Sequence, residues 1–390
     1  MNISETYIPL KSAFHLGPDP IDKPDMGISI QKFPFQSSYD FPVPVHPASK
    51  ISGLTDHTFS DPFIKENSSF TYPVFVPYGT GKFGEAIIML HGLNERNWDK
   101  YLPWAQNLAN QTKKPVILFP FSFHINRSPQ DWYDPRKLNE YLLIRQKQYR
   151  DVQASSFLNL ALSNRLTEYP ERFFLSGYQS VNDLSQLIRT IQAGQHPLFE
   201  KGTQTNLFAY SIGVFLLQCM MIANPDNLLD NSKFFFLAGG SLFCHMNGVS
   251  KYIMDSKAHE SIQNYYIFRM EDEIMEEKIA TSILNLTQIG QAFRSMILPD
   301  RFRQIRENMF RFFNKNLRVV ALKNDQVIPA KESAEAIACG LNKIPDNVTI
   351  IDPPYPYIHE NPFPVKLKEY KNAIDSVFEM VFGQAAAFLG

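Results

Sequence analysis

The sequence predicts an α/β fold built on a mostly parallel, doubly wound sheet. Apolar runs such as residues 85–90 and 317–322 are continuous rather than alternating, which is typical of strands buried on both faces. Stretches with helical periodicity separate these runs, and strands that alternate with helices favour a parallel sheet. Polar or small residues follow several of the runs. Ligands of such sheets bind outside the carboxyl ends of the strands, so these positions are the first candidates for a functional site.

Length and composition narrow the class of protein. The chain has 390 residues, which is enough for one large domain with insertions or for two domains. A net charge of −1 gives no electrostatic case for binding nucleic acid or an anionic membrane surface. The three cysteines are widely spaced without a Cys-x-x-Cys pair, which argues against a disulfide framework or a zinc site. The first residues lack the features of a signal peptide, and no uncharged apolar run reaches transmembrane length. We therefore expect a cytoplasmic protein with no integral membrane segment; the sequence does not indicate an oligomeric state.

Residues 1–68 differ in composition from the rest of the chain. They are rich in Pro, Ser and Asp, with Phe interspersed. Proline and turn residues disfavour long helices and central strands, whereas the aromatic residues argue against simple disorder. We expect an extended N-terminal arm with a few edge strands, packed on a main domain of residues 69–390.

The first half of the main domain has the pattern of two parallel strands joined by a helical crossover. Residues 69–76 alternate as a strand does, and residues 85–90 and 115–119 are continuous apolar runs that predict two buried strands. A helix over residues 99–112 would join these two, which gives a parallel pair. Helical periodicity follows through residues 138–166.

The second half continues the alternation. Residues 180–183 resemble a capping box, so Ser180 is expected to open a helix that runs to about residue 193. The later elements are a strand at 233–237, helices within 250–315 broken at Pro299, strands at 317–322 and 347–351, and a last helix at 367–382.

The chain is organised around residues 206–218, which pass from an apolar, β-prone start into a helical run. Ser211 lies at the turn between them. A serine there can be held on a strained strand-to-helix elbow with its hydroxyl exposed above the sheet. Strand and helix nearly collide at such an elbow, so the residues two before and two after the serine must be small. Ala209 and Gly213 meet that need, although glycine is the usual residue at the first position.

A serine nucleophile needs a base, and the base needs an acid to orient it. Asp325 directly follows the strand at 317–322, and His359 follows the strand at 347–351. Both therefore lie at the edge of the sheet where Ser211 is expected. Asp352 is a competing acid, but it lies close to His359 in sequence and precedes two prolines.

The order Ser211, Asp325, His359 resembles that of the α/β-hydrolase superfamily. The resemblance covers residues 69–385 by pattern and is closest to serine esterases and lipases. It implies an oxyanion hole made by the backbone N–H groups of Ile212 and Leu93, the latter in the loop after strand 85–90. His91, at the start of that loop, is expected to stabilise the conformation of the loop rather than to take part in the reaction.

The same resemblance implies that long insertions cover the site. Residues 121–170 and 244–315 are such insertions and would form a cap of helices. His124 and Trp132 in the first and Met309 in the second are candidate substrate-binding residues. The alternatives are that the first two only stabilise a loop, and that Met309 and its aromatic neighbours are all core.

We therefore expect a serine hydrolase that cleaves a carboxylic ester or a related acyl bond through an acyl-serine intermediate. Its partner would be a small-molecule acyl substrate, and no metal or organic cofactor is implied. Two alternatives remain open. An acyltransferase would use the same three residues, and a non-catalytic binding protein would keep only the fold.

Overall fold

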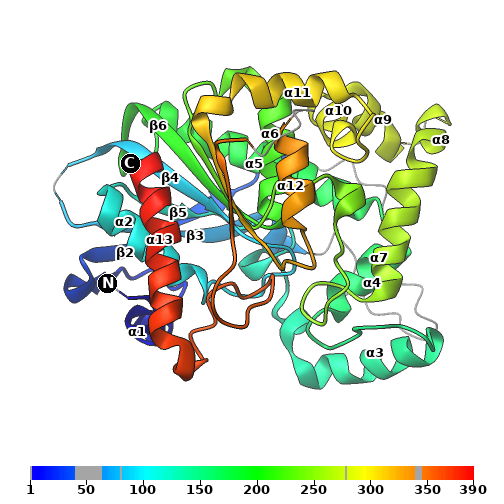
Figure 1. Cartoon of the computed structure of the whole chain (residues 1–390), viewed down its shortest axis with the longest axis horizontal. Helices are drawn as coiled ribbons and strands as arrows, with labels where there is room; N and C mark the ends of the chain where they lie inside the picture. The colour runs from blue at the N-terminus through cyan, green and yellow to red at the C-terminus, as the bar shows by residue number, and fades with distance from the viewer. Residues whose placement is uncertain (1, 40–63, 80, 277–278, 339–344) are drawn as a thin grey trace.

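One β-sheet runs through the middle of the molecule (Figure 1). The structure is a computed structural model that describes residues 2–39, 64–79, 81–276, 279–338 and 345–390. Within these ranges the sheet has nine strands in the order β1-β2-β3-β5-β4-β6-β7-β8-β9. The strands are β1 (Ile21–Lys23), β2 (Ile28–Gln36), β3 (Ser69–Pro77), β4 (Phe83–Leu90), β5 (Val116–Leu118), β6 (Phe199–Tyr210), β7 (Phe234–Leu237), β8 (Leu317–Leu322) and β9 (Val348–Ile351).

The sheet is mostly parallel, as the sequence predicts. The pairs from β5 through β4, β6, β7 and β8 to β9 are all parallel, whereas β1, β2 and β3 pair antiparallel at the other edge. The predicted crossover between β4 and β5 is confirmed, because the two strands pair in parallel and α2 (Tyr101–Thr112) connects them. The α/β fold class is therefore confirmed.

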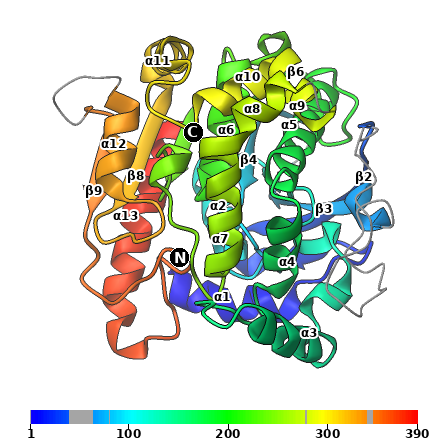
Figure 2. The ribbon, with the colours of Figure 1, turned by 90° about the vertical axis from the view of Figure 1, so that its right-hand side faces the viewer.

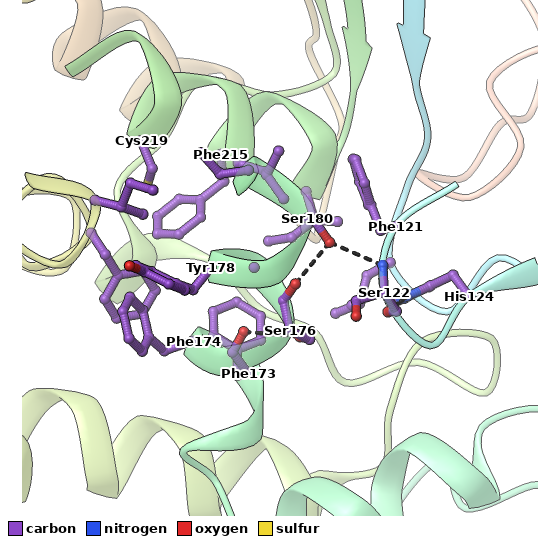
Figure 3. A pocket seen from close by; sticks show the side chains of 17 residues that line it. Phe121, Ser122, His124, Phe173, Phe174, Ser176, Tyr178, Ser180, Phe215 and Cys219 are labelled. Carbon is purple, nitrogen blue, oxygen red and sulfur yellow. Dashed lines mark hydrogen bonds between the residues drawn. The ribbon is translucent and has the colours of Figure 1, made fainter. Parts of the chain in front are cut away.

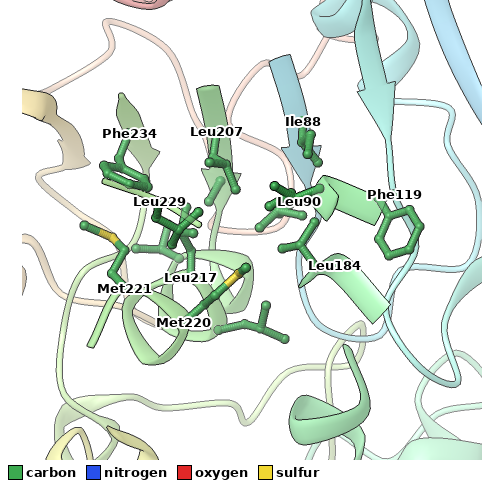
Figure 4. Close-up of a cluster of buried hydrophobic side chains, with 14 of the residues drawn as sticks. Ile88, Leu90, Phe119, Leu184, Leu207, Leu217, Met220, Met221, Leu229 and Phe234 are labelled. Atoms are coloured by element: carbon green, nitrogen blue, oxygen red, sulfur yellow. The ribbon is translucent and has the colours of Figure 1, made fainter. Parts of the chain in front are cut away.

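Helices cover both faces of the sheet (Figure 1). One face carries α1 (Ile3–Ala13), α2 and α13 (Lys371–Leu389); the other carries α5 (Arg172–Gln192), α6 (Ile212–Ala223), α11 (Arg303–Phe312) and α12 (Ala330–Ala338). Successive residues of a strand point to opposite faces. In β6, Leu207 contributes to the core beneath α5 and α6, and Phe208 to the core beneath α2 and α13. Continuous apolar strands are thus explained by two buried faces, one of which is drawn in Figure 4.

A further group of helices lies beside α5 and α6, away from the sheet (Figure 2). It consists of α3 (Pro135–Gln148), α4 (Leu160–Glu168), α7 (Ser256–Gln263), the π-helix η9 (Asn264–Arg269), α8 (Met270–Met275), α9 (Ile279–Leu286) and α10 (Gln288–Ser295). A buried ion pair joins its two segments of chain: the Arg145 guanidinium binds both carboxylate oxygens of Asp255 at 2.5 and 2.8 Å. These helices fall in the two expected insertions, whose role as a cap stays a prediction.

The predicted start of the helix at Ser180 is wrong. α5 begins at Arg172, and Ser180 lies inside it. The Ser180 hydroxyl donates to the backbone oxygen of Ser176 at 2.7 Å, one turn earlier, instead of capping a helix end. It also accepts the backbone N–H of Ser122 at 2.9 Å. A local Ser-x-x-Asp pattern therefore reflects a tertiary contact here.

The N-terminal segment is more regular than its composition suggests. Its described part forms α1, β1 and β2, and β2 pairs with β3 along nine residues. Residues 40–63 of the expected arm lie outside the described ranges, so an arm over residues 1–68 packed on the main domain stays a prediction. None of the helices in the described ranges combines the length and apolar character needed to cross a bilayer.

Candidate active site

Ser211 lies on a strained elbow between β6 and α6. Its backbone has φ 60° and ψ −128°, a conformation that residues with a side chain rarely adopt. The first turn of α6 lies close against the end of β4 and its loop: a Cβ on Gly213 would come within 2.6 Å of the backbone oxygen of His91. Ala209 is fully buried at the preceding small position. The elbow geometry expected from the sequence is thus present, with alanine in place of the usual glycine.

Ser211, His359 and Asp325 form a continuous hydrogen-bonded chain. The Ser211 Oγ lies 2.6 Å from His359 Nε2, and His359 Nδ1 lies 2.6 Å from Asp325 Oδ2. The three residues follow β6, β9 and β8, whose parallel carboxyl ends meet at one edge of the sheet. Each is about 4% exposed, so the chain is shielded from bulk water. This arrangement can pass a proton from the hydroxyl to the imidazole.

Backbone groups fix the orientation of Asp325. Its Oδ1 accepts the backbone N–H groups of Val327 and Ile328 at 2.8 and 2.9 Å, which leaves Oδ2 for the imidazole. His359 is held from the other side: the Tyr210 hydroxyl donates to its backbone oxygen, and the two rings stack with centroids 5.7 Å apart. The imidazole therefore has little freedom to turn away from Ser211.

The competing carboxylate, Asp352, lies elsewhere. It accepts hydrogen bonds from Lys323 Nζ at 3.0 Å and from Asn324 Nδ2 at 2.9 Å, and its side chain is 45% exposed. Geometry thus pairs His359 with Asp325 rather than with Asp352.

Two backbone amides beside Ser211 are available to a ligand. Within the described part of the chain, the N–H groups of Leu93 and Ile212 have no hydrogen-bond partner. The Leu93 loop touches the serine, because a Cβ on Gly92 would lie 3.4 Å from the Cβ of Ser211. His91 holds this loop: its Nδ1 donates to the Gly92 oxygen at 2.7 Å, and its Nε2 accepts the backbone N–H of Phe121 at 2.9 Å. Burial lowers the pKa of His91 well below its ordinary value, so the ring is neutral in this role.

Three hollow spaces surround these amides. A small apolar cavity of about 40 Å³ is lined by Ser211 itself and by residues of α7, such as Ile262. A second apolar cavity of about 60 Å³ lies between α5 and α6 (Figure 3). A polar cleft of about 480 Å³ is lined by Ile358 and Glu360, the two sequence neighbours of His359. Leu93 lines all three spaces.

The structure brings only one of the three candidate substrate-binding residues to a cavity. His124 lines the second cavity; its Nδ1 donates to the Ser122 oxygen at 2.8 Å, and burial lowers its pKa to about 4. Trp132 lies in a separate apolar cluster with Leu138 and Leu160.

Met309 is not at the site. It is 6% exposed and packs in the core beneath α6 with Phe310 and Phe313. Met309, Phe310 and Phe313 are therefore core residues, which was the alternative to a substrate-binding role. Phe312, by contrast, is 64% exposed. The cavity linings also include residues without a sequence signal, among them Phe173 and Phe243. The described residues contain no group of three His, Cys, Asp or Glu side chains that could hold a metal ion.

Comparisons with solved structures give matches at low identity and low TM-score. An esterase from Pseudomonas putida is 11% identical, with a TM-score of 0.45 over 99% of this chain and 89% of the esterase. Carboxyl esterase 2 from Tuber melanosporum is 10% identical, with a TM-score of 0.44 over 99% of this chain and 98% of that protein. An esterase from Pyrobaculum calidifontis is 9% identical, with a TM-score of 0.45 over 98% of this chain and 91% of that protein. No curated protein matches the chain. DUF6051, a family of unknown function, matches residues 1–390, and the chain belongs to that family.

Proposed function

We propose that the protein is a serine hydrolase that cleaves a carboxylic ester or a related acyl bond. The observation that carries the proposal is the chain from Ser211 through His359 to Asp325 on a strained elbow, beside two amides without partners. Serine reacts only when a base removes its proton, and the base here lies 2.6 Å away. The proposal rests on this geometry rather than on the likeness to known esterases.

The reaction proceeds in two halves. Ser211 Oγ attacks the carbonyl carbon while His359 Nε2 takes its proton, and Asp325 holds the other ring nitrogen as the N–H tautomer. The N–H groups of Leu93 and Ile212 stabilise the oxyanion. His359 then gives its proton to the leaving alcohol, and the acyl-serine forms. Water, deprotonated by His359, attacks the carbonyl carbon of this ester; the bond to Ser211 Oγ then breaks, His359 returns the proton to that oxygen, and the carboxylic acid leaves.

The surroundings favour a particular orientation of the substrate. We place the leaving group, which receives its proton from His359, on the side of the polar cleft, whose lining includes the sequence neighbours Ile358 and Glu360. The acyl chain then enters the apolar cavity at Ser211. The substrate class that fits is an ester of an apolar acid with a polar alcohol.

Labelling with a fluorophosphonate tests the nucleophile. Wild-type protein should be labelled at Ser211, and Ser211→Ala should not be labelled although it folds. Ser176→Ala, which alters another serine near the cavities, serves as the control and should be labelled normally. Absence of labelling in the wild-type protein would favour a non-catalytic binding protein.

The size of the polar cleft supports acyl transfer as a second candidate. A space of about 480 Å³ can hold an acceptor alcohol or amine as well as a leaving group. Adding a polyol such as glycerol during ester turnover distinguishes the two reactions. A transferase would form the glycerol ester in excess over the free acid, whereas a hydrolase would form mainly the acid.

A further inference from the structure

The two apolar cavities share one wall. Leu93, Phe173 and Ile212 line both the cavity at Ser211 and the cavity between α5 and α6. Leu93 and Ile212 belong to the loop and elbow that form the proposed oxyanion hole. Phe173 is the member of this wall that lies outside that machinery, in the first turn of α5. It is half-buried, whereas its neighbour Phe174 is fully buried.

The ring of Phe173 lies between the linings of the two cavities. On the Ser211 side its centroid is 5.5 Å from that of Phe243, which lines the first cavity only. On the other side it is 6.3 Å from Phe215 and 6.2 Å from Phe293, which line the second cavity only. Figure 3 shows Phe173 and Phe215 around the second cavity. The ring therefore lies in the wall between the two spaces.

We propose that Phe173 sets the longest acyl chain that the site accepts, by dividing one potential tunnel into two. This inference rests on the proposed function. The cavity at Ser211 is small, about 40 Å³, and suits a short acyl chain such as butanoyl. Joined to the cavity of about 60 Å³ between α5 and α6, it would suit a longer chain such as octanoyl.

Removal of the Phe173 ring should join the two cavities without breaking hydrogen bonds. The side chain is apolar and packs against the rings of Phe215, Phe243, Tyr266 and Phe293, so Phe173→Ala removes no hydrogen bond. Phe174→Ala is the matched control. Phe174 lines the second cavity only, and its rings in contact are Tyr178 and Phe293 rather than Phe173. Its truncation enlarges the second cavity and keeps the wall.

The experiment measures kcat/KM for the nitrophenyl esters of acetate, butanoate and octanoate with the full chain. The wild-type protein should prefer butanoate. Phe173→Ala should raise the ratio of octanoate to butanoate at least tenfold, since each buried methylene contributes up to about fourfold. Phe174→Ala should change that ratio by less than about twofold. Equal use of octanoate and butanoate by the wild-type protein, or an equal gain in both variants, would overturn the proposal.

A binding measurement separates this inference from the proposed reaction. In the Ser211→Ala background, octanoate binding is followed by calorimetry with and without Phe173→Ala. Tighter octanoate binding after loss of the ring supports the role of Phe173 as the wall between the cavities. If no ester is hydrolysed but this result is obtained, only the proposed function is contradicted. Unchanged octanoate binding would contradict the proposal that Phe173 divides the two cavities. If Phe173→Ala does not fold, Phe173→Leu tests the same point, with a smaller gain expected for octanoate.

Discussion

Replacing Asp325 by asparagine tests the proposed acid with almost no change in shape. The Oδ1 atom of Asp325 accepts two backbone N–H groups, from Val327 and Ile328. An asparagine must keep its oxygen there, because its NH₂ group would otherwise face two donors. The NH₂ group therefore takes the place of Oδ2 and points at Nδ1 of His359.

This reversal changes the tautomer of His359. The NH₂ group donates to Nδ1, so the ring proton moves to Nε2, which faces Ser211 Oγ at 2.6 Å. An Nε2 that already carries a proton cannot accept one from serine. The expected loss in kcat is about 10⁴-fold, the size of effect that this tautomer change has in a serine triad. The two backbone hydrogen bonds persist, so we expect the free energy of unfolding to fall by less than about 1 kcal/mol.

Steady-state hydrolysis of nitrophenyl butanoate and the rate of fluorophosphonate labelling measure the effect. Urea denaturation measures the stability of the same sample. Asp352→Asn is the matched control, because Asp352 is a half-exposed carboxylate paired with Lys323. It should leave turnover within about twofold and stability within about 0.5 kcal/mol. The reasoning is refuted if Asp325→Asn keeps more than a tenth of wild-type turnover, or if Asp352→Asn is the damaging change.

Three further predictions concern stability and packing. Gly213→Ala places a Cβ 2.6 Å from a backbone oxygen, so it should destabilise the fold by about 1–3 kcal/mol and abolish labelling; thermal denaturation and labelling check this. Arg145→Met leaves the buried Asp255 carboxylate without its cation and should cost about 3–5 kcal/mol in urea unfolding. The pKa of His124 is about 4 in the folded protein and ordinarily 6.5, so the unfolded chain takes up a proton first as pH falls. His124 should therefore contribute a decline in stability from about pH 6.5 to 4 of up to about 1.4 kcal/mol per pH unit. His124→Asn, which can still donate to the Ser122 oxygen, should lack this contribution.

The sheet could be predicted from the sequence because its strands are buried on both faces. β8 has the predicted bounds, and β4, β7 and β9 differ from prediction by one or two residues. Parallel strands also bring their carboxyl ends to one edge, which is why three residues distant in sequence could be named before their contact was known. Their catalytic roles stay predictions.

Prediction from the sequence is wrong where contacts between distant residues determine the local structure. Ser180 matches a helix-start pattern, yet its hydroxyl bonds within α5 and to Ser122, a residue far away in the chain. Met309 lies on an apolar helical stripe, and periodicity cannot indicate whether the stripe faces a core or a cavity. α1 contains Pro9, which argues against a helix, but it packs on α2 and α13. The wall residue Phe173 has no local signal at all.

The candidate site combines residues that are far apart in the chain and come together only when most of the sheet has formed. Ser211 and His359 are 148 residues apart, and β7 and β8 lie between the strands that end near them. Pairings of such sequence separation form slowly, since the loop between them must close first. An intact Ser211–His359 contact thus requires the whole half-sheet from β6 to β9. A reagent that modifies only an activated serine would then act as a clock for refolding, because it would react with Ser211 only in molecules in which that half-sheet is complete.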